Sequence, residues 1–238
     1  MNILAIGAHP DDLETSCGGT LAKYAKLGHK VFTATTTNGN VGSSTLPMEE
    51  IARIRKEEAR KAAAHIGAEY ICLDYDDEMF FEDRAARLAV INLVRYCKAD
   101  IILTHNPVDY NPDHELTSKI VSDIPVMVAV EKIKTKYPAY DKTPIVVYWE
   151  PVYGLGFVPT EYVDITDVMD VKMAMCREHK SQVSWMQDNY KEVMSDKDFF
   201  EDYYTIARYR GIQCGVQYAE GFRMAYDAYR VVPRRVLP

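Results

Sequence analysis

The chain has 238 residues, of which 47% are hydrophobic and 26% are charged, and its formal net charge at pH 7 is −7. This length and composition are typical of a soluble globular protein, and we interpret residues 1–238 as one domain. The acidic balance argues against a nucleic-acid partner, and no apolar stretch is long enough to cross a bilayer. The five cysteines form no CxxC pair. With no signal-peptide pattern at the start, they favour reduced thiols and a cytoplasmic location.

Strands and helices alternate along the first part of the chain. In chain order, the pattern predicts a strand over Asn2–Ala8, a helix over Gly18–Leu27, a strand over Lys30–Thr37, a helix over Pro47–Gly67, a strand over Tyr70–Leu73, a helix over Arg84–Cys97 and a strand over Asp100–Leu103. Strands separated by helices of this length favour an α/β fold with a mostly parallel sheet and right-handed crossovers.

The later part of the chain is less regular. It predicts a helix over Thr117–Lys136 interrupted at Pro125, a strand over Ile145–Trp149, a long helix over Val168–Met186 and a helix in the second half of Tyr190–Tyr209. The closing stretch Arg230–Pro238 is locally basic, and we interpret it as a solvated tail or a packing arm. We find no linker-like segment, which fits the single-domain interpretation.

Acidic and histidine side chains follow the first and the fourth predicted strands. The loop after the first strand carries His9, Asp11 and Asp12, and the loop after the fourth carries His105, Asp109, Asp113 and His114. In an open parallel sheet, ligands bind beyond the carboxyl ends of the strands where the strand order reverses. For the order 3-2-1-4, that point lies between these two strands. Convergence of the two loops on one crevice therefore predicts a metal site.

The residue types in the two loops indicate which metal the site would hold. Two imidazoles and one carboxylate, with one position left open, are typical of hydrolytic zinc, whereas Mg²⁺ prefers oxygen ligands alone. We therefore predict His9, Asp12 and His114 as the ligands of Zn²⁺. Asp11 is then free to act as general base toward the attacking water. Asp113 is predicted to orient one of the imidazoles.

Each of these residues also has a purely structural interpretation. An Asp pair before a helix is often an N-cap, and a histidine at a strand end often serves a backbone group. Asp113 can be a turn former. The presence of both loops after the appropriate strands favours the metal site over these alternatives.

The segments that carry these residues resemble a known enzyme family. Ala8–His29 (AHPDDLE…GGTLAKYAKLGH) and Asn111–Thr117 (NPDHELT) are similar to the LmbE-like, or PIG-L-like, deacetylases, and the HPDD and PDH motifs are specific as a pair. Further similar segments are Ile54–Glu69 (IRKEEARKAAAHIGAE), His179–Gln182 (HKSQ) and Tyr218–Arg223 (YAEGFR). The resemblance implies a three-layer Rossmann-like fold with one zinc site at the carboxyl ends of strands 1 and 4.

The resemblance also implies a reaction. It indicates a zinc-dependent hydrolase that removes an N-acetyl group from a small amino-sugar substrate, such as an N-acetylglucosamine-type conjugate. The family pattern assigns Asp11 as the base that later returns a proton to the leaving amine. Arg55 matches the family arginine that is thought to reach the substrate.

Asn111 departs from the family pattern. The family frequently has a histidine three residues before the last metal ligand, where it polarises the acetyl carbonyl or protonates the product. The Asn111 amide can donate a hydrogen bond to an oxyanion, but it cannot carry a mobile proton. This substitution predicts a slower enzyme or an altered substrate.

A few other side chains are candidates for contact with the substrate. Glu14 can hydrogen-bond a sugar hydroxyl or serve as a first-turn helix acid. His105 or His179 can compensate for the histidine that Asn111 replaces, or each can be structural. The aromatic stretch Tyr148–Phe157 is either the rim of the site, plain core, or a contact between copies of the chain in a homo-oligomer.

Two other functions stay open. One is a metal-dependent amidase that acts on a larger sugar-conjugate amide. The other is a non-catalytic sugar- or nucleotide-binding module with a Rossmann-like fold. Against the second stands the SCGGT segment, which lacks the GxGxxG and GxxxxGK patterns of a phosphate cradle.

Overall fold

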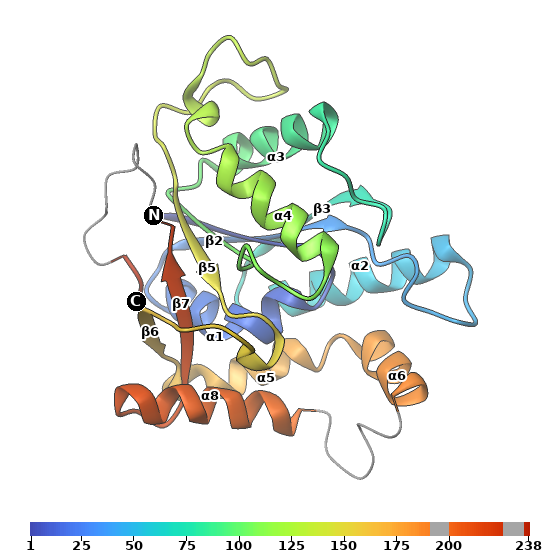
Figure 1. Ribbon diagram of the computed structural model, residues 1–238, viewed down its shortest axis with the longest axis vertical. Coiled ribbons are helices and arrows are strands. Elements are labelled where there is room, and N and C mark those ends of the chain that lie inside the picture. Colours follow the sequence, from blue (N-terminus) through green and yellow to red (C-terminus); the bar gives the residue numbers. More distant parts are fainter. Residues whose placement is uncertain (191–199, 226–235) are drawn as a thin grey trace.

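The structure, a computed structural model, describes residues 1–190, 200–225 and 236–238 (Figure 1). The strands are β1 (Asn2–Gly7), β2 (Lys30–Thr37), β3 (Glu69–Tyr75), β4 (Ile101–Thr104), β5 (Ile145–Trp149), β6 (Glu161–Asp164) and β7 (Ala219–Met224). The helices are α1 (Asp12–Lys26), α2 (Met48–Ala64), α3 (Arg84–Cys97), α4 (Pro112–Asp123), α5 (Met169–Cys176), α6 (Lys180–Asn189) and α8 (Glu201–Cys214). Short 3₁₀ turns lie at Met127–Ala129, Val152–Gly154 and Thr166–Val168.

The strands form one sheet in the order β3-β2-β1-β4-β5-β7-β6. The first five strands pair in parallel, and β7 pairs antiparallel with both β5 and β6. Figure 1 shows α3 and α4 on one side of the sheet and α1, α5 and α8 on the other. The predicted three-layer α/β fold with a mostly parallel sheet is confirmed, and the first four strands have the 3-2-1-4 order.

The first strand shows why the sheet is buried on both faces. Ile3 and Ala5 pack in the hydrophobic cluster that includes side chains of α1, α5 and α8. Leu4 and Ile6 pack in the opposite cluster, with side chains of α3 and α4. Because successive strand residues point to opposite faces, a strand covered on both sides must be apolar throughout. The carboxyl end of β1 is therefore the first point at which polar side chains can gather.

The glycine pair in α1 allows close packing between this helix and its neighbours. A Cβ atom on Gly19 would lie only 2.7 Å from Cγ2 of Ile165, and one on Gly18 would lie 3.4 Å from Cγ of Lys172. These glycines therefore let α1 approach α5 and the end of β6. The helix begins at Asp12, earlier than the predicted start at Gly18.

A buried ion pair lies at this close contact. The Lys172 ammonium and the Glu220 carboxylate lie 2.5 Å apart, and both side chains are 3% exposed. Glu220 also accepts hydrogen bonds from the Gly19 and Thr20 amides and the Thr20 hydroxyl, at 2.9, 2.8 and 2.7 Å. Lys172 donates a second hydrogen bond to the Thr15 carbonyl at 2.7 Å. The pair therefore joins β7 and α5 to the helix that begins at Asp12.

The predicted helix over Thr117–Lys136 is wrong in its extent. The observed helix α4 begins at Pro112 and ends at Asp123. Asn111 caps its start and Pro112 occupies its first turn, where the missing proline amide costs no hydrogen bond. Pro125 lacks the donor needed to continue the helix.

The predicted long helix over Val168–Met186 is also wrong, because two helices replace it. α5 and α6 are separated at His179, whose φ of −80° and ψ of 57° are not helical. The helix expected in the second half of Tyr190–Tyr209 is present as α8, although residues 191–199 lie outside the described part. Most of the basic stretch Arg230–Pro238 also lies outside it. Among the described residues, no helix is both long enough and apolar enough to span a membrane.

Candidate metal centre

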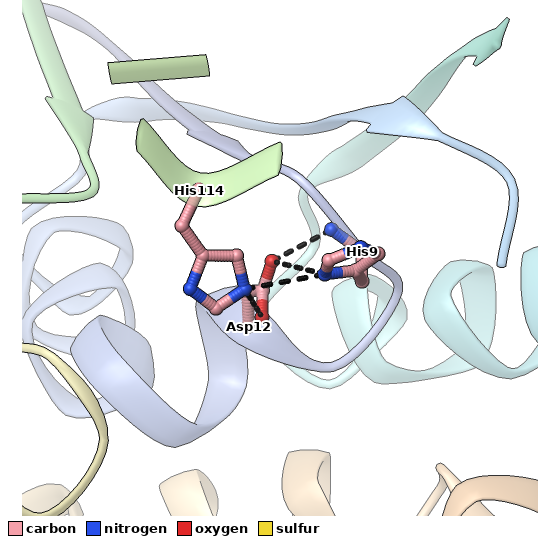
Figure 2. A group of neighbouring side chains, drawn as sticks. All are labelled: His9, Asp12 and His114. Carbon is pink, nitrogen blue, oxygen red and sulfur yellow. Dashed lines mark hydrogen bonds and ion pairs between the residues drawn. The ribbon is translucent and has the colours of Figure 1, made fainter. Parts of the chain in front are cut away.

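Three side chains from the predicted loops meet at the carboxyl end of β1. His9 follows this strand, Asp12 opens α1, and His114 lies in the first turn of α4. The His9 Nδ1 and His114 Nε2 atoms are 3.2 Å apart, and His114 Nε2 lies 3.3 Å from Asp12 Oδ1. Figure 2 shows the three side chains turned toward one another. The ligand atoms lie within 4.8 Å of one another, so this group can hold a metal ion.

The outward nitrogens of both imidazoles face carboxylates. His9 Nε2 lies 2.8 Å from Asp77 Oδ1, and His114 Nδ1 lies 3.0 Å from Asp109 Oδ1. A neutral imidazole carries one proton, and a carboxylate favours that proton on the nitrogen that faces it. The two inward nitrogens then present lone pairs to each other across 3.2 Å. This arrangement is unfavourable unless a proton or a metal cation lies between them.

The separation of the inward nitrogens also suits a metal ion of the predicted kind. Zinc–nitrogen bonds are about 2.0–2.1 Å long, so two nitrogens on a tetrahedral zinc lie about 3.3 Å apart. The observed distance of 3.2 Å between His9 Nδ1 and His114 Nε2 fits this requirement. The donor set, two imidazoles and one carboxylate, therefore fits a metal ion that prefers nitrogen as well as oxygen ligands.

The electrostatics of the group favour positive charge. Burial alone would lower the pKa of His114, but Asp12 and Asp109 raise that pKa to about 9. Burial likewise opposes ionisation of Asp12, but His114 and His105 hold its pKa well below the usual value. The site therefore stabilises a carboxylate beside a proton or a cation.

Asp113 contacts the imidazole of His9 and not that of its sequence neighbour His114. Its carboxylate is 3.5 Å from His9 Nε2 and accepts a hydrogen bond from the Glu78 amide at 2.8 Å. Asp77 and Asp109 make the shorter contacts to the two imidazoles. Asp109, which precedes α4, was predicted to lie in the convergent loop but was given no role, and Asp77 was not predicted. Asp77 follows the third predicted strand, and its position after a strand end was the available signal.

Asp11 does not cap the helix that follows it. Its side chain makes no capping hydrogen bond, and its φ of 126° lies in a region that residues other than glycine rarely adopt. Such backbone strain costs about 1–3 kcal/mol and is concentrated at functional sites. Burial raises the pKa of Asp11 to about 6, although the positive charge of Arg55 opposes this rise. The carboxyl group is therefore poised to exchange a proton near neutral pH.

Arg55 lies beside Asp11 in a tight pocket. Its guanidinium donates to the Pro10 carbonyl at 2.8 Å and lies 3.3 Å from Asp11 Oδ1. A Cβ on Gly39 or Gly42 would lie within 2.7 Å of this guanidinium, so the glycines make room for it. Arg55 lines the cleft described below, and its observed contacts fix the loop that carries Asp11.

Asn111 also lines the cleft, and its amide already has partners. The carbonyl oxygen of its side chain accepts hydrogen bonds from the Asp113 and His114 amides at 2.8 and 3.3 Å. Its NH₂ group donates to Glu78 at 3.2 Å. Asn111 therefore fixes the helical turn that presents His114.

His105 contacts two of the predicted metal ligands, His114 and Asp12. Its ring stacks on His114, and its Nδ1 accepts a hydrogen bond from the Trp149 indole at 3.3 Å. Its Nε2 accepts a hydrogen bond from the Ala8 amide at 3.0 Å and lies 3.1 Å from Asp12 Oδ2. Burial, together with the charge of His114, lowers the pKa of His105 to about 4, so this imidazole is neutral.

Glu14 and His179 are not brought to the wall of the cleft. Both side chains are almost fully buried, and His179 Nε2 lies 3.2 Å from Glu14 Oε2. They join α1 to the break between α5 and α6. The charge of Glu14 raises the pKa of His179 against the opposite effect of burial. Their observed contact is a structural one beneath the site.

The metal group opens into a cleft of about 560 Å³. Its lining residues come from the strand ends, from the loop after β5 and from the late helices. They are His9, Asp11, Asp12, Thr15, Val41, Gly42, Arg55, Asp77, Glu78, Tyr110, Asn111, His114, Val152, Tyr153, Leu155, Gln182, Trp185, Met186, Tyr190, Asp202 and Tyr203. Part of the aromatic stretch Tyr148–Phe157 therefore does lie at the site.

The fold and this group define an α/β protein with a candidate metal site at the carboxyl ends of β1 and β4. A family model described as PIG-L, GlcNAc-PI de-N-acetylase, matches residues 4–124, which is half of the chain. The chain belongs to the PIG-L family. The resemblance seen in the sequence is thereby confirmed.

Individual relatives extend this likeness over nearly the whole chain. The diacetylchitobiose deacetylase of Thermococcus kodakarensis is 28% identical over 235 residues, covering 93% of this chain and 82% of that protein. The structure of N,N'-diacetylchitobiose deacetylase from Pyrococcus horikoshii has a TM-score of 0.78 and 25% identity, covering 94% of this chain and 83% of that chain. The 4-carboxy-2-hydroxymuconate hydratase from Pseudomonas putida has a TM-score of 0.82 and 23% identity, covering 99% and 100%, and shares the fold. The expectation of an enzyme of the deacetylase family is confirmed.

Proposed function

We propose that the protein is a zinc-dependent hydrolase that removes the N-acetyl group from an amino sugar or an N-acetylglucosamine-type conjugate. Its membership of the PIG-L family and its likeness to two diacetylchitobiose deacetylases support this reaction class. His9, Asp12 and His114 would hold the zinc ion. When bound, zinc supplies a Lewis acid that polarises a carbonyl and lowers the pKa of water to about 7.

The residues of the chain supply proton transfer and positioning. Asp11 takes a proton from the attacking water while the water oxygen bonds to the acetyl carbon. The carbon–nitrogen bond then breaks, and Asp11 returns the proton to the leaving nitrogen, giving a free amine and acetic acid, which releases its proton to water and becomes acetate. Arg55 holds Asp11 in place, and the raised pKa of about 6 suits both proton transfers.

The observation that carries this proposal is the position of Asp11. It lies in the cleft next to the ligand group, makes no capping hydrogen bond, and adopts a strained backbone conformation that the surrounding loop maintains. A purely structural aspartate at a helix start would use its side chain to cap the first turn.

The test compares the wild type with Asp11→Asn. We expect the variant to keep its zinc content and to release acetate from N-acetylglucosamine conjugates about 100-fold more slowly, or worse, because the general base is lost. Glu57→Gln is the control, since Glu57 pairs with Arg60 on α2 and does not line the cleft. Zinc is measured by elemental analysis and acetate by a coupled assay.

Three outcomes would contradict parts of the proposal. If Asp11→Asn keeps both its zinc and its full rate, Asp11 is not the base. If the zinc-loaded wild type releases no acetate, the deacetylase assignment fails. Loss of ultraviolet absorbance from an unsaturated dicarboxylate, without any acetate release, would instead indicate a hydratase.

A second candidate is hydrolysis of a larger amide in a sugar conjugate. The extent of the cleft favours it, because the lining continues from the metal group to the side chains of α6 and α8. Release of an acyl fragment other than acetate would identify this activity. We further propose a cytoplasmic location, which the five free thiols support. Self-association of the chain stays a prediction.

A further inference from the structure

The charges along the cleft are strongly biased toward one sign. The acidic lining residues are Asp11, Asp12, Asp77, Glu78 and Asp202, whereas Arg55 is the sole Lys or Arg lining the cleft in the described part of the chain. The five carboxylates outnumber the positive charges even when the double charge of a bound zinc ion is added to that of Arg55. The Arg55 side chain is 4% exposed, and its guanidinium contacts the Pro10 carbonyl and Asp11. Binding of a phosphate or carboxylate group normally uses accessible Arg or Lys side chains or free backbone amides. This cleft presents no accessible Lys or Arg in the ranges the structure describes.

Two of the acids line the cleft without belonging to the predicted ligand set. Glu78 is exposed and adopts a positive φ of 62°, with its backbone amide bonded to Asp113. Its carboxylate accepts a hydrogen bond from Asn111, which fixes its place beside the metal group. Asp202 comes from the first turn of α8, and it adds to the effect of burial in raising the pKa of the Tyr153 phenol. Glu78 and Asp202, which come from segments distant in sequence, thus both place a negative charge in the wall of the cleft.

The remaining wall of the cleft is aromatic and accessible. Tyr110 and Tyr153 are 73% and 50% exposed, and Trp185 is half-buried. Exposed large apolar side chains next to a polar centre mark a binding surface. Flat aromatic rings pack well on the apolar face of a ring-shaped ligand while their polar atoms stay solvated. The cleft therefore combines apolar packing with repulsion of anions.

We infer that the cleft selects uncharged or cationic amino-sugar conjugates and rejects phosphorylated or carboxylated ones. Glu78 and Asp202 provide the repulsion, and Trp185 with Tyr153 packs against the ring beyond the acetamide. The cleft volume of about 560 Å³ lies within the usual range for pockets that bind small molecules, about 300–1,000 Å³. This inference rests on the proposed function, because it assumes that the acetamide of the substrate faces the metal group.

Binding is measured on the zinc-loaded Asp11→Asn variant, so that turnover does not interfere. The probes are the methyl glycoside of N-acetylglucosamine and its 6-phosphate, titrated by calorimetry. We expect the neutral sugar to bind about tenfold more tightly than the phosphate at low ionic strength. We expect this ratio to shrink as salt is added, because exposed charges are screened.

Variants added to this background locate the effect. Glu78→Gln and Asp202→Asn should each narrow the ratio by about twofold to fivefold, which corresponds to one exposed charge interaction, whereas the matched control Glu57→Gln should leave it unchanged. Trp185→Ala should remove any preference for a disaccharide over the monosaccharide.

The failures of the two proposals are distinguishable. Equal or tighter binding of the 6-phosphate, or a ratio that neither Glu78→Gln nor Asp202→Asn changes, would overturn the inference even if the wild type releases acetate. Absence of acetate release from the wild type, with the neutral preference intact in the binding experiment, would overturn the proposed function and leave the selectivity standing.

Discussion

His105 stacks on His114 with ring centroids 3.9 Å apart and ring planes 18° from parallel. The same imidazole lies 3.1 Å from Asp12, so one neutral side chain contacts two of the three predicted metal ligands. Trp149 fixes its orientation from β5. The metal group is therefore supported by a residue that directly follows β4, the strand next to β1.

Replacement of His105 separates its two contributions. His105→Phe keeps a flat ring against His114 but loses the polar contact with Asp12, and we expect zinc affinity to fall about 10–100-fold. His105→Gln can donate from a similar position and should retain more of the affinity. Competition with a chromophoric chelator measures both. Unchanged affinity in His105→Phe would show that the contact to Asp12 does not tune the site.

The carboxylates behind the imidazoles should act in the same way. Asp77→Asn and Asp109→Asn leave the ligands in place but weaken the preference for a proton on the outward nitrogens. We expect each to weaken zinc binding about 10–100-fold. Activity at saturating zinc should recover in part. Asp141→Asn is the control, because Asp141 is exposed. Equal zinc affinity in Asp77→Asn, Asp109→Asn and Asp141→Asn would contradict the role of the two carboxylates in metal binding.

Adjacent glycines in α1 should differ in how much the same substitution destabilises the protein. Gly19→Ala places a methyl group 2.7 Å from Ile165, and overpacking of this kind costs about 1–3 kcal/mol of stability. Gly18→Ala meets its nearest neighbour at 3.4 Å, so the higher helix propensity of alanine should offset any strain. Urea unfolding measures both. A Gly19→Ala protein as stable as the wild type would show that α1 can move away from Ile165.

Replacement of Glu220 should destabilise the fold more than replacement of its buried partner Lys172. Glu220→Ala leaves the buried Lys172 ammonium without its anionic partner, and we expect a loss of about 3–5 kcal/mol in the free energy of unfolding. Lys172→Met should cost less, because three donors from Gly19 and Thr20 still stabilise the carboxylate. Chemical denaturation of both variants gives the comparison. The reverse order would mean that Lys172 is the more easily solvated partner.

The core of the site follows from the sequence because it depends only on strand order. His9 and His114 are far apart in the chain, but both follow strands that a 3-2-1-4 sheet places side by side. Asp77 does not follow from that rule, because its strand β3 is separated from β1 by β2. Its approach to His9 depends on the path of the turn after β3.

Burial explains the other differences between sequence and structure. The carboxylate of Glu14 could bind a ligand if it were accessible, but this side chain faces His179 inside the protein. The helix break at His179 leaves little trace in the sequence, because no proline or glycine lies between Met169 and Asn189. The strands β6 and β7 are short and partly polar, which conceals them from period-based prediction.

The position of β7 has a consequence for synthesis of the protein. This strand leaves the ribosome after all three candidate metal ligands, yet its Glu220 bonds to the helix that starts at Asp12. A nascent chain that has produced His9, Asp12 and His114 still lacks that anchor. Loading of the metal should therefore become secure only after translation has passed residue 224, and shortened products should be poor metal binders.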